Sequence, residues 1–154
     1  MAAQVDLRRL RPLVRRIGLS SRAGRIRALG ECLTLFHRGR VPVEYDELVR
    51  LPGVGLYSAA VVRIVSFSKP DFPVDGNVFR FVSRYLGVGL RGTKLEARQV
   101  REGLMGLVPR NEGGEWFYGL LDFAAKVCRK RAPQCQQCPL GRECAYSKVE
   151  ARKG

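Results

Sequence analysis

Four of the five cysteines lie close together near the end of the chain, spaced C-x6-C-x2-C-x5-C: Cys128, Cys135, Cys138 and Cys144. Thiols this close in sequence bind a metal centre or pair as disulfides, and nothing in the sequence suggests the secretion that disulfides usually accompany. Structural zinc sites more often use two close-spaced pairs or cysteine–histidine mixtures. One C-x2-C pair with two more distant flanking cysteines suits an iron–sulfur cubane. We therefore expect a [4Fe–4S] cluster, with zinc as the second choice.

The remaining metal-ligand types do not extend this site. Cys32 lies among apolar residues at helical spacing, which indicates a small core residue rather than a ligand. His37, the single histidine, sits at the end of a predicted helix beside basic residues and reads as a surface residue. The sequence therefore favours neither a Ser-His-Asp arrangement nor a histidine-based metal site.

A second candidate site is the glycine-containing turn at residues 51–55, with the sequence Leu-Pro-Gly-Val-Gly. Good helix formers precede it and small apolar residues follow it. Pro52 ends the first helix, and Gly53 and Gly55 permit backbone angles closed to other residues. Together with Val54 they leave N–H groups uncovered at the start of the second helix, where an anion is favoured. Taken alone, the same residues fit an ordinary helical hairpin equally well.

The charge of the chain indicates which anion to expect. Its 154 residues carry 28 Lys and Arg against 14 Asp and Glu, a formal net charge of +14. Such an excess favours binding to phosphate backbones. The run Arg129, Lys130 and Arg131 lies between the first two of the four cysteines. A cluster ligated at both ends would hold this loop out as a rigid phosphate-binding projection.

Nothing in the sequence predicts a membrane or an export signal. The chain has no run of 18 apolar residues, and its first six residues lack the apolar core of a signal peptide. We therefore expect an intracellular protein, either cytoplasmic and associated with the nucleoid or located elsewhere inside the cell.

The elements that must position these residues are predicted to be helices. Apolar residues recur at helical spacing and almost never alternate, so the fold class is all-α. The predicted helices cover residues 7–17, 22–36 (capped by Ser20 or Ser21), 45–50, 57–67, 74–86, 94–107 and 116–128. Two prolines within residues 68–73 indicate a linker. We predict two helical lobes, residues 1–69 with the hairpin and residues 70–154 with Asp75 and the four-cysteine loop.

Three features, in the same order, resemble the helix-hairpin-helix DNA glycosylases of the endonuclease III superfamily. They are the hairpin at 51–55, the segment Val-Asp-Gly-Asn-Val-Phe-Arg at 74–80, and the cysteine spacing. The resemblance runs from about Leu10 to Tyr146. It implies that the partner is double-stranded DNA with a mismatched or damaged base, which flips into the cleft between the lobes.

The resemblance assigns the central catalytic role to Asp75. Breaking an N-glycosidic bond develops positive charge on the sugar. An ionised carboxylate beside the sugar stabilises that charge and orients or deprotonates a water. The simpler alternative is that Asp75 only caps its helix; one oxygen can cap while the other faces the cleft. Asn77 and Arg80 would then support the backbone, although Arg80 reads equally well as a solvated helix residue.

Position 57 distinguishes branches of the family. Strand-cleaving relatives have a lysine here, whose amine forms a Schiff base with the sugar. Adenine glycosylases typically have a serine. The tyrosine at position 57 resembles the residue at this position in the thymine/uracil mismatch glycosylases, which release T or U opposite G by hydrolysis. The ring would stack on, or hydrogen-bond to, the flipped nucleotide; its alternative role is packing against the hairpin.

The resemblance thus implies a monofunctional, hydrolytic base-excision-repair glycosylase without lyase activity. Alternatives within the class are an endonuclease III-like damaged-pyrimidine glycosylase and an adenine glycosylase. A different class is a non-catalytic iron–sulfur DNA-binding module. Family members have several further helices before the point where this sequence begins. We therefore expect a missing N-terminal segment, or a second chain, to complete the first lobe.

Overall fold

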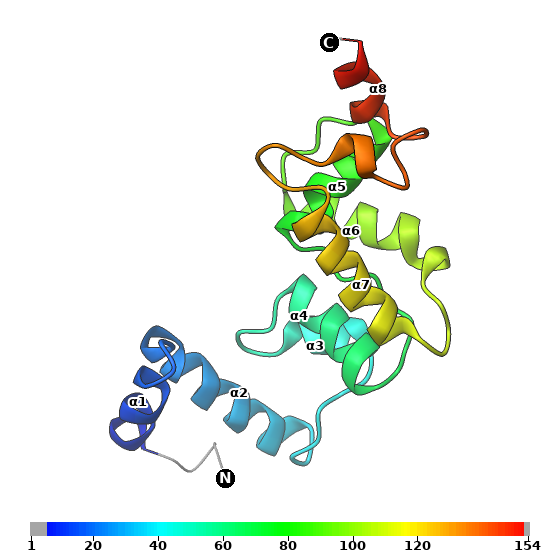
Figure 1. Ribbon diagram of the computed structural model, residues 1–154. Coiled ribbons are helices and arrows are strands. Elements are labelled where there is room, and N and C mark those ends of the chain that lie inside the picture. The colour runs from blue at the N-terminus through cyan, green and yellow to red at the C-terminus, as the bar shows by residue number, and fades with distance from the viewer. Residues whose placement is uncertain (1–5, 153–154) are drawn as a thin grey trace. The chain divides into compact units, whose positions relative to one another are not determined.

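The computed structural model describes residues 6–152, and every regular element in that range is a helix, as Figure 1 shows. The predicted all-α class is confirmed. The elements are α1 (Leu7–Arg15), η2 (Ser20–Arg22), α2 (Ala23–Phe36), α3 (Tyr45–Arg50), α4 (Leu56–Val61), η3 (Val62–Ser66), α5 (Gly76–Leu86), α6 (Lys94–Leu104), η4 (Met105–Leu107), α7 (Gly113–Lys126), η5 (Cys135–Gln137) and α8 (Ala145–Ala151). Within residues 6–152 no helix is long and apolar enough to span a membrane.

The chain divides into two compact units, one ending at Gly55 and the other beginning at Leu56. The division predicted after residue 69 is not the division between these units, because α4 packs against α6 and η3 packs against α7. As a description of the two lobes of the family fold, it stays a prediction.

The first unit is built around α1 and α2, which pack against each other. Asp6 caps α1, because its side chain accepts a hydrogen bond from the Arg8 N–H at 3.0 Å. Val14 is buried on α1, and Leu48 is buried on α3. Cys32 lies on α2 and is only half-buried.

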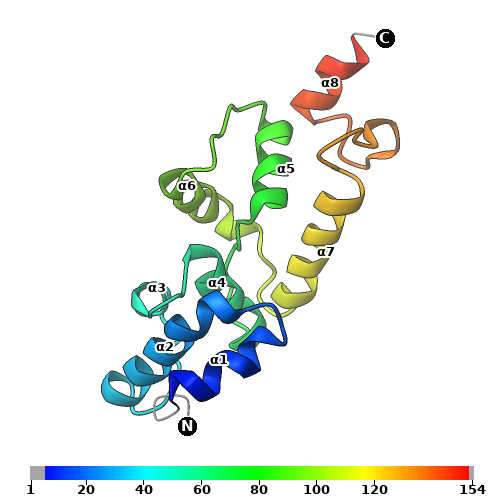
Figure 2. The same cartoon turned by 90° about the vertical axis from the view of Figure 1, so that its left-hand side faces the viewer.

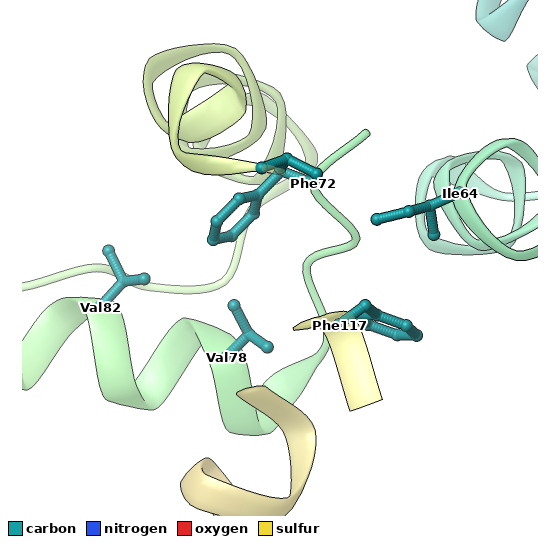
Figure 3. Packing of buried hydrophobic residues seen from close by; sticks show 6 residues of the cluster. Ile64, Phe72, Val78, Val82 and Phe117 are labelled. Atoms are coloured by element: carbon teal, nitrogen blue, oxygen red, sulfur yellow. The ribbon is translucent and has the colours of Figure 1, made fainter. Parts of the chain in front are cut away.

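The second unit has one apolar core, shown in Figure 3. Its buried members come from η3, from α5, from α7 and from the two segments that follow η3 and η4; they are Ile64, Phe72, Val78, Val82, Val108 and Phe117. Phe72 makes an edge-to-face contact with Trp116, with ring centroids 5.5 Å apart. The core therefore fixes the helices that carry Tyr57 and Asp75 relative to one another.

The segment predicted as a linker contributes to this core. Asp71, Phe72 and Pro73 are all buried. η3, which precedes the segment, is a π-helix that continues α4. The prolines mark a break between helices, as predicted, but the break lies inside the unit and not on its surface.

The four-cysteine segment follows α7 as an irregular stretch and leads into α8 (Figure 2). α5 packs against both α7 and α8. Gly87 ends α5 with φ 70°, a left-handed conformation that favours glycine. A Cβ added there would lie 2.8 Å from the Cβ of Ala145, so α8 approaches α5 only because position 87 has no side chain.

Candidate functional site

Asp75 caps α5, as its position in the sequence predicts. Its Oδ1 accepts hydrogen bonds from the N–H groups of Asn77 at 2.9 Å and Val78 at 2.8 Å. Its Oδ2 accepts one from the Asn77 side-chain amide at 3.1 Å. Asp75 remains half-buried and lines an open pocket. Capping thus uses one oxygen and leaves the other able to act on a bound group.

Tyr57 lies on α4 close enough to Asp75 for the two to interact electrostatically. Its side chain is 38% exposed, and its ring centroid lies 6.4 Å from that of the buried Phe117. Burial raises the pKa of Tyr57 above 10.0, and the negative charges of Asp75 and Tyr118 raise it further. The structure therefore brings together the two predicted catalytic residues, and Tyr57 keeps its proton at neutral pH.

Tyr118 is a member of this neighbourhood that the sequence analysis missed. It lies on α7, is 55% exposed, and its ring centroid is 5.5 Å from that of Phe117. Phe117 thus packs between two partly exposed tyrosines, Tyr57 and Tyr118. The available signal was a large aromatic residue on the exposed side of an otherwise apolar helix.

Arg80 is a structural residue and not a solvated one. Its Nε donates to the carbonyl of Cys128 at 2.9 Å, and its Nη2 donates to the carbonyl of Ala124 at 2.7 Å. Its Nη1 donates to the side-chain oxygen of Asn77 at 3.1 Å. Because Asn77 also donates to Asp75, hydrogen bonds run without a break from the carboxylate of Asp75 to the main chain of Cys128.

The four predicted cysteine ligands line one pocket. Much of the remaining wall is aromatic or apolar, contributed by Phe81, Tyr85, Phe123, Leu140 and Tyr146. Arg84 supplies the nearby cation: its Nη1 lies 3.6 Å from the Sγ of Cys128. The pKa of the Cys135 thiol is raised by burial and then by negative charge on the other three cysteines, while Arg84 lowers it.

This donor set fits an iron–sulfur cluster. Within residues 6–152 no three His, Cys, Asp or Glu side chains gather closely enough to hold a single metal ion. A [4Fe–4S] cluster bonds each thiolate to a different iron, so its ligands surround a pocket instead of meeting at one point. The four thiols surround a pocket in this way, and Arg84 beside them complements a thiolate-ligated, negatively charged cluster.

The basic loop at 129–131 is held from inside by Arg84. The guanidinium of Arg84 donates to the carbonyls of Arg129 at 2.6 Å and Lys130 at 3.2 Å. The guanidinium also lies over the ring of Tyr146, whose centroid is 4.7 Å away. Arg129, Lys130 and Arg131 are all exposed. Because its backbone is already held by Arg84, the loop can present these cations to a phosphate without having to become ordered when DNA binds.

The glycine turn agrees only in part with its prediction. Gly53 has φ 80°, a conformation that requires glycine, whereas Gly55 does not have positive φ. The N–H of Val54 donates to the carbonyl of Leu51 at 3.1 Å, so the turn itself uses this group. The N–H groups of Gly53 and Gly55 have no partner within the part of the chain that the structure describes.

Arg25 is a second residue that the sequence analysis did not select. Its side-chain carbons pack over Gly53, with its Cβ 3.2 Å from the position that a Cβ on Gly53 would occupy. Arg25 is exposed, and its guanidinium has no partner among residues 6–152. Its neighbour on the same helix, Arg27, is instead paired with Glu31 at 2.7 Å.

Comparisons with known proteins find relatives of this chain. The chain is 33% identical over 134 residues to the thymine/uracil-DNA glycosylase of Methanothermobacter thermautotrophicus, covering 86% of this chain and 61% of the relative. It is 33% identical over 151 residues to endonuclease III of Bacillus subtilis, covering 97% of this chain and 68% of the relative. The chain thus spans about three-fifths to two-thirds of the length of these relatives.

Solved structures agree. A thermostable thymine-DNA glycosylase matches with a TM-score of 0.86 at 30% identity, covering 96% of this chain and 69% of that one. Endonuclease III in a non-covalent complex with DNA matches with a TM-score of 0.76 at 34% identity, covering 98% and 70%. No family model matches the chain. Together, the relatives and the helical fold show that the chain belongs to the endonuclease III superfamily of helix-hairpin-helix DNA glycosylases.

Proposed function

We propose that this chain carries the catalytic site of a DNA glycosylase that hydrolyses the N-glycosidic bond of T or U mispaired with G. The observation that carries the proposal is the tyrosine, in place of a lysine, at position 57, in the same compact unit as Asp75. A phenol cannot form the Schiff base on which strand cleavage depends. Relatives named thymine/uracil-DNA glycosylase support the same assignment.

Asp75 acts through charge. As the sugar–base bond breaks, the carboxylate stabilises the positive charge that develops on the sugar. The same group orients or deprotonates the water that attacks the sugar. Asn77 holds the outward oxygen of Asp75 at 3.1 Å and so limits the rotation of the carboxylate. Tyr57 stays protonated and offers a hydroxyl and an aromatic face to the flipped nucleotide.

Duplex DNA with a mismatched base is the proposed partner, bound mainly through its phosphates. The proposed contacts are the amides of Gly53 and Gly55 and the cations Arg129, Lys130 and Arg131. Val54 lies between the two glycines, and its amide closes the turn. Such contacts carry no base information, so they set affinity and register. Acting on DNA requires an intracellular location, and we propose a cytoplasmic, DNA-associated one.

Cys128, Cys135, Cys138 and Cys144 are the proposed ligands of a [4Fe–4S] cluster. When bound, the cluster supplies a cross-link between segments that otherwise share few regular hydrogen bonds, and it takes no part in the reaction at Asp75. Cys32, on α2, lies in the other compact unit. Arg84 then holds the loop between the first two ligands.

The test is a base-release assay of the protein on duplexes that contain G·T, G·U, A·8-oxoguanine or an oxidised pyrimidine. Release from G·T and G·U, leaving an intact abasic site, is the expected result. Preferred release of an oxidised pyrimidine or of adenine would reassign the substrate to the endonuclease III-like or adenine branch.

The matched control is Asp75→Asn, which keeps the capping oxygen and removes the charge. It should lower the rate by about 10²-fold or more while duplex binding persists. Binding without release on any duplex, by the wild type and Asp75→Asn alike, would identify a non-catalytic DNA-binding module.

A further inference from the structure

Asp71 is a buried carboxylate that the proposed reaction does not use. Its exposed fraction is 0%, and it is the buried charged residue of the described chain. Oδ1 accepts hydrogen bonds from Arg101 Nε at 2.6 Å and from the Phe72 N–H at 2.8 Å. Oδ2 accepts from Arg63 Nε and from Arg101 Nη2, both at 2.8 Å. The carboxylate is therefore held by four donors and has no freedom to rotate.

The three charged residues come from three different segments, which we call the Arg63–Asp71–Arg101 triad. Arg63 lies on η3, the continuation of the helix that carries Tyr57. Asp71 lies in the segment that ends at Asp75, and Arg101 lies on α6. The arginine side chains are only 15% and 14% exposed. The triad thus joins the backbone that carries Tyr57 to the backbone that delivers Asp75.

Stability alone does not explain such a cluster. Removing charges from water costs several kcal/mol for each ion, and apolar replacements of a buried ion triad are often as stable. What the triad adds is geometry, because the planar fork of Arg101 spans both oxygens of Asp71 in one orientation. Phe72 and Pro73, the next two residues, are buried as well. Fixing Asp71 therefore also limits the movement of the backbone that leads to Asp75.

We propose that Arg63, Asp71 and Arg101 are positioning residues that set Asp75 relative to Tyr57. None of the three is assigned contact with the substrate. The expected effect on catalysis rests on the proposed function, whereas the expected effect on the position of Asp75 does not. Misplacing a reacting group by about 1 Å costs about 10²-fold in rate. A triad that holds Asp75 in place therefore affects catalysis without taking part in it.

The test replaces the triad by apolar side chains, in the variant Arg63→Met/Asp71→Leu/Arg101→Met. The first readout is the titration of Tyr57, isolated by subtracting the spectrum of the same protein with Tyr57→Phe. Asp75 is one cause of the raised Tyr57 pKa. If Asp75 is displaced, the Tyr57 pKa falls toward 10.0. Loss of the net positive charge of the triad would by itself raise this pKa. Because burial is the larger cause of the raised pKa, the fall is assigned to Asp75 by adding Asp75→Asn, which should lower the Tyr57 pKa of the wild-type protein and leave that of the triple variant unchanged.

The second readout separates catalysis from binding. The triple variant should lose about 10²-fold in kcat while its affinity for duplex DNA stays at the wild-type value. Asp71→Asn alone is the harsher change, because it leaves two buried arginines without their counter-ion. The control is Lys126→Met, which removes an exposed ion pair with Asp122 and should change neither readout.

The outcomes are distinguishable. A folded triple variant with the wild-type Tyr57 pKa and the wild-type kcat would overturn the proposal. If the wild type releases no base, the proposed function fails, but the Tyr57 titration still decides whether the triad positions Asp75. If the triple variant does not fold, Arg101→Lys, which keeps the charge and loses the fork, gives the same two readouts.

Discussion

The carboxylate of Asp75 is connected to the main-chain carbonyl of Cys128 by three consecutive hydrogen bonds. They run from Asn77 to Asp75, from Arg80 to Asn77 and from Arg80 to Cys128, at 3.1, 3.1 and 2.9 Å. The residue proposed to act on the sugar therefore shares a hydrogen-bond network with the first proposed ligand of the cluster. A change in the position of Cys128 can therefore alter the position of Asp75 through this network, and the reverse also holds.

Arg80→Lys tests this connection. A lysine has one terminal nitrogen in place of the guanidinium fork and cannot replace all three hydrogen bonds of Arg80, and a carbonyl left without its donor costs about 2 kcal/mol. We expect faster loss of iron to a chelator and a lower rate of base release. Arg98→Lys on the exposed face of α6 is the control. Wild-type iron retention in Arg80→Lys would show that the network does not stabilise the four-cysteine segment.

The ligand set is tested by single cysteine substitutions. Anaerobically purified protein should be brown, with about four iron and four sulfide per chain. Cys138→Ser should lose this colour and the order of the basic loop, whereas Cys32→Ser should keep both. Metal analysis and the visible absorption spectrum measure the effect. Zinc without iron in the anaerobic wild-type protein would contradict the cluster assignment.

Arg25 and Arg27 are a matched pair for DNA contact. Arg25 packs over Gly53 and its guanidinium has no partner among residues 6–152, while Arg27 is held by Glu31 on the same helix. Arg25→Ala should weaken binding to all duplexes alike and lower the slope of log K against log salt by about one unit. Arg27→Ala should change the slope less. Equal slopes for the two variants would mean that Arg25 does not contact a phosphate.

Gly87 and Gly89 make a comparable pair for stability. An alanine at position 87 has φ 70° and meets the Cβ of Ala145, so Gly87→Ala should cost about 2 kcal/mol and loosen α8. Gly89→Ala meets nothing within 4 Å and should be neutral. Denaturation with urea measures both. Equal stability of the two variants would show that α8 moves away from α5 at little cost.

The parts of the fold that depend on local pattern could be predicted from the sequence. Asp6 and Asp75 cap their helices, and Gly87 ends α5, because each of these features is decided within four residues. The joining of Asp75 to Tyr57 followed from the family resemblance and not from local pattern. The linker predicted at 68–73 is a break between helices whose residues Asp71, Phe72 and Pro73 are buried, since proline content says where a helix stops but not whether the break faces solvent.

Polar contacts between residues far apart in the chain could not be predicted from the sequence. The acceptors of Arg80 lie 44 and 48 residues away along the chain, and Arg101 lies 30 residues from Asp71. A periodic pattern assigns an arginine to a helix face but does not identify an acceptor on another element. For the same reason nothing distinguished Arg25, which packs on the turn, from Arg27, which pairs along its own helix.

Tyr57→Lys tests the proposed mechanism most directly. The wild-type protein has a phenol beside Asp75, so borohydride should trap no covalent adduct with the abasic product. A lysine at position 57 places an amine where strand-cleaving relatives have one, and trapping should appear. Burial, which raises the pKa of Tyr57, disfavours the charged ammonium of a lysine, whereas the negative charge of Asp75 favours it.

Asp75 therefore decides how much of the amine in Tyr57→Lys is reactive at neutral pH. Adding Asp75→Asn to this variant should shift the onset of trapping to lower pH, because the neutral amine then forms more readily. Tyr57→Phe, which has neither hydroxyl nor amine, is the control and should trap nothing. Efficient trapping by the wild-type protein would mean that another amine reaches the sugar, and the hydrolytic assignment would then be wrong.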